Sequence, residues 1–180
     1  MLSPDRAREL LHELDDPGHL ELPEHHDLPA ARQRFARLAD ALERRFGPSV
    51  TAGTVQDASF HGYVSVPAPA AGTERPLWVL LSNFGPFVTV GTGRDWGLPG
   101  CEEGLSDTFV TWLDELCTEL GCVYVPVDLL LEPYDGPSPI GEEDFPEEVL
   151  ATLAAQDGDE PEEEAEDPPP AWWDRYFQYM

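Results

Sequence analysis

The sequence of 180 residues contains no lysine, and its ten basic residues are all arginine. The same chain has 36 aspartate and glutamate residues, which give a formal net charge of −26. Residues 101–180 hold 23 of these acidic residues and only one basic residue, Arg175. A field of this sign repels nucleic acids and anionic membranes and attracts basic proteins. We therefore expect a basic protein as partner, and neither a nucleic acid nor a membrane.

Long apolar segments and paired cysteines are missing too. The longest apolar run, Leu77 to Leu81, is far shorter than the roughly 20 residues that a membrane-spanning helix needs. The chain does not start with a basic region followed by an apolar stretch, so we expect no signal peptide. The three cysteines form no CxxC pair, which is typical of a reduced compartment. These absences predict a cytoplasmic protein.

The sequence also lacks the motifs of common catalytic and cofactor-binding sites. It has no GxSxG and no HExxH, and Gly91-Thr92-Gly93 is too short for a phosphate-binding loop. Among the five histidines, His25 and His26 are adjacent in a polar loop and lack the spacing of zinc ligands. We therefore expect a protein that is not an enzyme and that holds no cofactor and no metal ion.

Helical and strand patterns follow one another along the first 155 residues. N-cap residues and apolar stripes predict helices that begin at Ser3-Pro4-Asp5, span Pro29 to Phe46 and follow Ser106-Asp107, with a short further helix at 146–155. Strands are predicted at 59–66, 77–81, 87–90 and 122–131, and short connections favour antiparallel pairing. The predicted fold class is α+β, an antiparallel four-stranded sheet with helices packed mainly on one face.

Composition divides the chain into three parts. Residues 1–155 are predicted to form a single α+β domain. Residues 156–170 contain eight acidic residues and four prolines, with no aromatic and no β-branched residue. Such a segment cannot bury enough apolar surface to offset chain entropy, which predicts a disordered acidic linker.

Residues 171–180 form the third part and contain five aromatic residues. A helical turn would stack Trp172 on Tyr176 and Trp173 on Phe177, because each pair is four residues apart. One interpretation is that the segment folds back and seals an apolar groove on the domain. The other is a docking peptide for another protein, since aromatic residues and arginine dominate binding hot spots.

Acidic and aromatic side chains of the second part of the chain are the candidates for partner contact. A net charge beyond what solubility requires costs self-repulsion, so we interpret it as a means of electrostatic steering. The predicted partner-binding residues are Trp96, Asp128, Glu132, Tyr134, Asp135, Glu142, Glu143, Asp144, Trp172, Trp173, Arg175 and Tyr176.

Four short segments of the chain form a familiar combination: Trp78 to Leu81, Ser82-Asn83-Phe84-Gly85, Tyr134-Asp135-Gly136 and Trp172 to Phe177. Together they resemble the small immunity proteins encoded beside bacterial polymorphic or contact-dependent toxins. The resemblance covers roughly residues 50–136 and the last nine residues. It implies a compact acidic α+β protein that binds its cognate toxin and blocks the toxin's active site.

The leading hypothesis is therefore an immunity protein, or antitoxin, that inhibits a basic toxin domain such as a nuclease or deaminase. Charge complementarity and steric occlusion would provide the inhibition, and the protein would be a monomer or weak dimer. Two alternatives are an adaptor that presents the C-terminal aromatic peptide and a DNA-mimic inhibitor that binds DNA-processing proteins in general.

Overall fold

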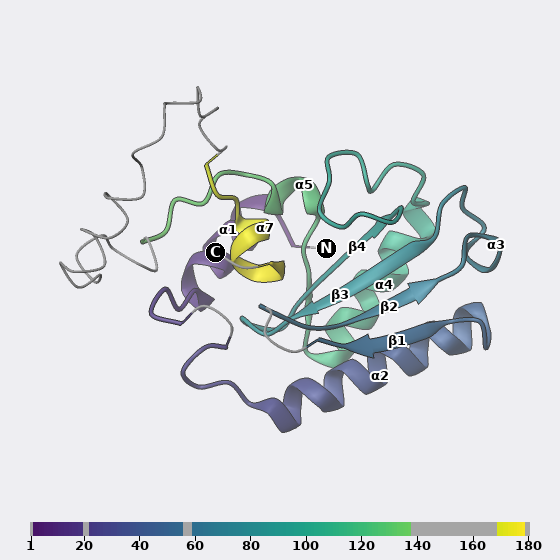
Figure 1. The fold of residues 1–180 in the computed structure, drawn as a ribbon, viewed down its shortest axis with the longest axis horizontal. Helices are drawn as coiled ribbons and strands as arrows, with labels where there is room; N and C mark the ends of the chain where they lie inside the picture. The colour runs from purple at the N-terminus through teal and green to yellow at the C-terminus, as the bar shows by residue number, and fades with distance from the viewer. Residues whose placement is uncertain (1, 20–21, 56–58, 138–168, 179–180) are drawn as a thin grey trace, which may run out of the picture.

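The computed structural model describes residues 2–19, 22–55, 59–137 and 169–178 (Figure 1). The predicted helix at 146–155 and nearly all of the predicted linker lie outside these residues. The described helices are α1 (Pro4–Leu14), α2 (Leu28–Phe46), α3 (Ala68–Ala71), α4 (Asp107–Leu120), α5 (Val127–Leu130) and α7 (Trp172–Phe177). The strands are β1 (Thr51–Thr54), β2 (Phe60–Val66), β3 (Leu77–Ser82), β4 (Phe87–Thr92) and β5 (Val123–Tyr124).

The strands form one mixed sheet in the order β1-β2-β3-β4-β5. The first four strands are antiparallel neighbours, and β5 runs parallel to β4 with Phe87 opposite Val123. The α+β class is confirmed, but the sheet has five strands, not four, and is not wholly antiparallel. The difference has a topological cause, because α4 carries the chain back across the sheet between β4 and β5, and such a crossover produces a parallel pair.

Two of the predicted strand assignments differ from the structure in detail. The predicted strand at 122–131 is reduced to Val123–Tyr124, because Pro126 begins the short helix α5. The edge strand β1 was not predicted at all. Its sequence, Thr-Ala-Gly-Thr, is short, polar and mostly exposed, so it carries no apolar alternation that would mark a strand.

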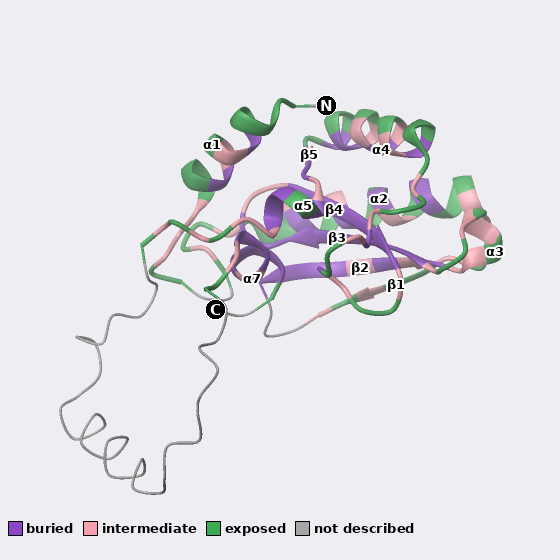
Figure 2. Cartoon of the chain, turned by 90° about the horizontal axis from the view of Figure 1, so that it is seen from above, coloured by how far each residue is buried: buried purple, intermediate pink, exposed green. Residues whose placement is uncertain are grey.

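Helices cover both faces of the sheet, which corrects the prediction that they lie mainly on one face. The central strands β3 and β4 are accordingly buried (Figure 2). On one face α2 and α4 pack against Val79 and Leu81 of β3. On the other face α1, α5 and α7 pack against Trp78 and Leu80. All six residues of β3 are buried, as expected for a central strand covered on both sides.

Local signals in the sequence set several helix ends. The side chains of Ser3 and Ser106 accept hydrogen bonds from the backbone N–H groups of Arg6 and Phe109, so both act as N-caps. Gly121 ends α4 in the left-handed conformation at φ 69°, which a side chain would disfavour.

The Gly97→Ala substitution is expected to destabilise the protein more than Gly104→Ala. Both glycines have positive φ (71° and 86°), so each substitution carries a backbone cost of about 1 kcal/mol. At Gly97 the new Cβ would lie 2.0 Å from Trp173 of α7, whereas nothing lies within 4 Å at Gly104. Overpacking adds about 1–3 kcal/mol. Urea unfolding measures the difference, and equal losses would contradict the packing of Trp173 on Gly97.

Candidate functional site

Carboxylates gather along the β5 edge of the sheet. Residues 95–174 contain 24 acidic residues and no lysine, arginine or histidine. In the described portion of this stretch, Glu102 and Glu103 lie in the loop before α4, Asp107 begins α4, and Asp128 lies in α5. We call these four residues the acidic edge. Each is exposed or half-buried, so their charges face solvent.

Glu102 connects the elements of the acidic edge through hydrogen bonds. One of its carboxylate oxygens accepts a hydrogen bond from the Tyr124 hydroxyl at 2.8 Å, and the other accepts from the backbone N–H of Asp128 at 3.4 Å. Neither donor is a cation, so the negative charge is retained. Its effect reaches the thiol of Cys101, whose pKa is raised to about 11 by burial and further by the charges of Glu102 and Asp128.

Asp128 is the one predicted acidic residue in this group, and the structure leaves it exposed. Glu102 and Glu103 are not in the predicted set, although they belong to the same acid-rich part of the sequence. The signal that identifies them is the complete absence of basic residues over 80 consecutive positions. The position of Glu102 between Tyr124 and Asp128 depends on the tertiary fold and leaves no mark in the local sequence.

Two other predicted acidic residues, Glu132 and Asp135, are paired with α1 of the same chain. The Arg8 guanidinium donates two hydrogen bonds to the Glu132 carboxylate, from Nε at 2.7 Å and Nη2 at 2.6 Å. These bonds hold the pKa of Glu132 below its usual range. Asp135 lies 3.2 Å from Nε2 of His12. The charges of Glu132 and Asp135 are therefore partly compensated by side chains of the same chain.

Trp96 and Tyr134 are half-buried, so part of each aromatic ring remains accessible. Trp96 packs against Phe60 and Tyr63, with ring centroids 5.6 and 5.4 Å apart. Tyr134 contacts the Trp172 ring at 4.7 Å. Both can therefore present an aromatic edge next to charged surface while their other side is held by the core.

The predicted aromatic segment forms α7, and the structure buries it against the rest of the protein. Trp172, Trp173 and Tyr176 are at most 3% exposed. Of the two ring pairs predicted to stack along the helix, Trp173 and Phe177 do so, with an interplanar angle of 25°, whereas the Trp172 and Tyr176 rings, 5.9 Å apart, are tilted by 36°. The Tyr176 hydroxyl also donates a hydrogen bond to the carbonyl oxygen of Leu11 in α1, at 2.5 Å. In this arrangement these three side chains form part of the core and are not offered to a partner.

Arg175, also predicted to bind a partner, is fully buried in an ion pair with Asp15. Its Nε lies 2.6 Å from the Asp15 carboxylate, and the two side chains are 0% and 5% exposed. Its Nη2 donates to the carbonyl oxygen of Asp16, and its guanidinium lies 4.0 Å from the centroid of the Phe84 ring. The other oxygen of Asp15 accepts a hydrogen bond from the Tyr134 hydroxyl at 2.6 Å. Asp15 was not a predicted site residue, because its role in the sequence is only to end a helix.

Backbone hydrogen bonds join residues 132–134 to residues 170–172, which flank the acidic segment 138–168 on either side. The N–H of Tyr134 donates to the carbonyl of Pro170 at 2.8 Å, and the N–H of Trp172 donates to the carbonyl of Glu132 at 3.1 Å. Residues 138–168 connect these two ends and hold 13 acidic residues with no basic residue. The predicted partner-binding residues Glu142, Glu143 and Asp144 fall in this segment, which lies outside the described residues.

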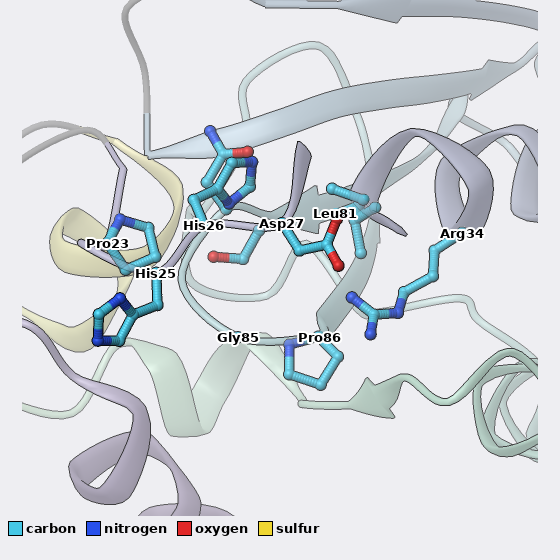
Figure 3. A pocket seen from close by; sticks show the side chains of 11 residues that line it. Pro23, His25, His26, Asp27, Arg34, Leu81, Gly85 and Pro86 are labelled. Atoms are coloured by element: carbon cyan, nitrogen blue, oxygen red, sulfur yellow. The ribbon is translucent and has the colours of Figure 1, made fainter. Parts of the chain in front are cut away.

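A pocket of about 170 Å³ lies between the loop before α2 and the turn from β3 to β4 (Figure 3). His25 and Arg34 lie at its opposite ends. Nε2 of His26 is shielded from solvent and makes no hydrogen bond. The histidines do not form a metal centre, because no three His, Cys, Asp or Glu side chains of the described residues are grouped to hold an ion. The pocket offers polar contacts but no arranged nucleophile and base.

The comparisons with known proteins give no relative. No family model, no curated protein and no solved structure matches the chain. Among the described helices, none has both the length and the apolar composition that crossing a bilayer requires. Any functional assignment must therefore come from the charges and contacts described above.

The Arg175→Ala substitution is expected to lower the free energy of unfolding by about 3–5 kcal/mol, because it leaves the carboxylate of Asp15 buried without its cation. Arg94→Ala removes an exposed arginine and is the matched control, with an expected change within about 0.5 kcal/mol. Chemical denaturation measures both. The double variant Asp15→Leu/Arg175→Met should lose less than either single substitution. Wild-type stability of Arg175→Ala would contradict the buried pair.

Proposed function

We propose that this chain is a non-enzymatic immunity protein of the bacterial cytoplasm that binds and inhibits a cognate basic toxin domain. The acidic edge and the acidic segment 138–168 attract the toxin, and the bound protein occludes the groove in which the toxin holds its own anionic substrate. A nuclease or a deaminase acting on nucleic acid fits this description, because such a groove is lined by basic side chains.

The observation that carries the proposal is the distribution of charge over the fold. Within the described residues, Glu103, Asp107 and Asp128 form no ion pair, so their charges remain available to another molecule. Residues 138–168, which connect the paired residues 132–134 and 170–172, add 13 further acidic residues and no basic residue to the chain. Such a field can raise association rates to about 10⁸–10⁹ M⁻¹s⁻¹ at low salt.

The burial of α7 supports an inhibitor over an adaptor. An adaptor that presents the aromatic segment as a peptide would have to release Arg175 from Asp15 and expose four buried aromatic side chains of α7. The accessible aromatic candidates are instead Trp96 and Tyr134, which are held from behind by the core. Rigid aromatic side chains of this kind lose little entropy on binding, which suits them as anchors.

Partner capture is the first experiment. The tagged protein would be incubated with its native lysate at low salt, and the retained proteins identified by mass spectrometry. A single stoichiometric basic protein whose activity falls when this chain is added would support an inhibitor. Retention of many DNA-processing proteins would favour a DNA mimic. Retention of many unrelated basic proteins that are all lost together at moderate salt would contradict the proposal, because it indicates a non-specific field.

Reversal of three charges in the acidic segment is expected to slow association. We expect Glu142→Lys/Glu143→Lys/Asp144→Lys to reduce the association rate constant at low salt by about tenfold or more, with a smaller change in the dissociation rate, because steering acts before contact. Stopped-flow fluorescence with the captured partner measures both rate constants over a range of ionic strength.

The control for this variant is Asp40→Lys/Glu43→Lys/Glu74→Lys, which changes the net charge equally but at exposed positions in α2 and after α3. This control should slow association much less. If both variants slow it equally, only the total charge matters, and the segment has no special place in the interface. If association of the wild-type protein does not respond to salt, electrostatic steering is wrong.

A further inference from the structure

Two rows of opposite charge lie side by side on the outward face of α2 and α4. The α2 row consists of Arg34, Arg37, Arg44 and Arg45, and the α4 row of Asp107, Glu115 and Glu119. Two exposed acidic residues of α2, Asp40 and Glu43, lie beside Arg44 and lower the net positive charge of the α2 row. All seven residues of the two rows are exposed except Arg34, which is half-buried. The two helices cover the same face of the sheet and contact one another.

The two helices run in opposite directions. At the C-terminal end of α2, the Arg45 guanidinium lies 4.3 Å from the centroid of the Trp112 ring, in the first half of α4. At the other end, Arg34 and Arg37 are close to Cys122, just after α4, where their positive charges oppose the burial that raises the pKa of this thiol. The row of arginines therefore runs along the whole length of α4.

The charges of the two rows do not neutralise one another within the molecule. Among the described residues, none of the seven side chains takes part in an ion pair. By contrast, Arg6 and Arg8 of α1 each pair with two carboxylates of the same chain. The arginines and acids of the α2–α4 face therefore remain available to a partner molecule.

The same face is hollowed on both sides of Trp112, which is half-buried. A hollow of about 420 Å³ lies on one side of the indole ring, lined by Ala41, Arg44 and Leu116 among others. A second hollow of about 500 Å³ lies on its other side, toward Thr108 and Glu115. The ring stands between the two hollows, next to the guanidinium of Arg45.

We propose that the α2–α4 face is a self-complementary interface through which two copies of this chain form a dimer. A two-fold axis that runs in the interface along the groove between the helices places α2 of one copy over α4 of the second copy. The arginine row of each copy then faces the acidic row of the other, twice in one isologous contact. Trp112 of each copy faces the end of α2 that carries Arg44 and Arg45 in the second copy.

Charge complementarity favours a second copy of this chain as the partner of the α2–α4 face. A uniformly basic partner is repelled by the α2 row, and a uniformly acidic partner is repelled by the α4 row. The surface that fits carries both rows, side by side and in antiparallel helices, and this chain itself supplies that surface.

The net charge of −26 gives this dimer a distinctive salt dependence. At about 0.01 M ionic strength the screening length is about 30 Å, so the whole molecules repel one another. At about 0.15 M it falls to about 8 Å, which screens that repulsion more than the short-range pairs between rows. At about 1 M the pairs are screened as well. Dimer formation is therefore strongest at intermediate salt, whereas binding of a basic toxin weakens steadily as salt is added.

The test uses complementary charge variants of the full chain. Variant A is Arg37→Glu/Arg44→Glu, and variant B is Glu115→Arg/Glu119→Arg. All four residues are exposed, and Arg45, which stacks on three aromatic rings, is left in place. Sedimentation velocity over a concentration series at about 0.15 M salt measures the dimer dissociation constant.

The wild-type protein is expected to dimerise, and each variant alone should dimerise about tenfold or more weakly, because like charges then face one another. An equimolar mixture of A and B should restore association as a heterodimer, since the four substituted positions then face charges of opposite sign. Arg75→Glu/Arg94→Glu, which reverses two exposed arginines outside both helices, should dimerise like the wild type.

Three results would overturn the proposal: a wild-type protein that stays monomeric over the whole concentration series, variants that dimerise as well as the wild type, or a mixture of A and B that stays monomeric. Circular dichroism and thermal unfolding of each variant establish that the fold is intact. None of these outcomes depends on the toxin, so failure of the dimer leaves the proposed inhibition standing, and the reverse also holds.

Discussion

The buried ion pair between Asp15 and Arg175 is the contact on which the arrangement of the two chain ends depends. A guanidinium taken out of water needs a carboxylate beside it, and Asp15 provides one at the end of α1. The same carboxylate accepts the hydroxyl of Tyr134, so three segments separated by up to 160 residues meet at one side chain. With this pair in place, the aromatic rings of α7 complete the core on that face of the sheet. The other face of the sheet is covered by α2 and α4, and the outer surfaces of these two helices carry the two rows of charge.

Much of the fold could be predicted from local patterns, because caps and apolar periodicity act over a few residues. Ser3 and Ser106 begin their helices and Gly121 ends α4, as the sequence indicates. The four-residue spacing of Trp173 and Phe177 also brings their rings together, 5.2 Å apart. Local patterns could not predict which helix or strand packs against which other element. The direction of β5 follows from the crossover through α4, and the second layer of helices follows from long-range packing of α1 and α7. Edge strand β1 is specified by its pairing with β2, not by its own side chains.

The negative charge of the candidate site could be predicted from the sequence, but the particular residues that form the site could be predicted only in part. Composition alone indicated a negative surface, and Asp128 lies on it. Yet Glu132 is paired with Arg8, which is 124 residues away in the sequence, and no local signal reveals such a neighbour. Arg175 and the tryptophans of α7 have the residue types of a binding hot spot, but the same types also suit a buried core. Residue type restricts the chemistry of a side chain, whereas only the tertiary fold decides whether that chemistry faces inward or outward.

The pairing of residues 132–134 with 170–172 has a consequence for how such a protein can diverge. Backbone hydrogen bonds hold the two ends of the intervening stretch next to one another. The entropic cost of a longer connection is small, about 0.6 kcal/mol for a doubling of length. A change in the length of this stretch is therefore expected to cost little in loop-closure entropy. Under the proposed function, an inhibitor could adapt to a changing toxin through substitutions and length changes in this stretch, while the paired junction stays the same.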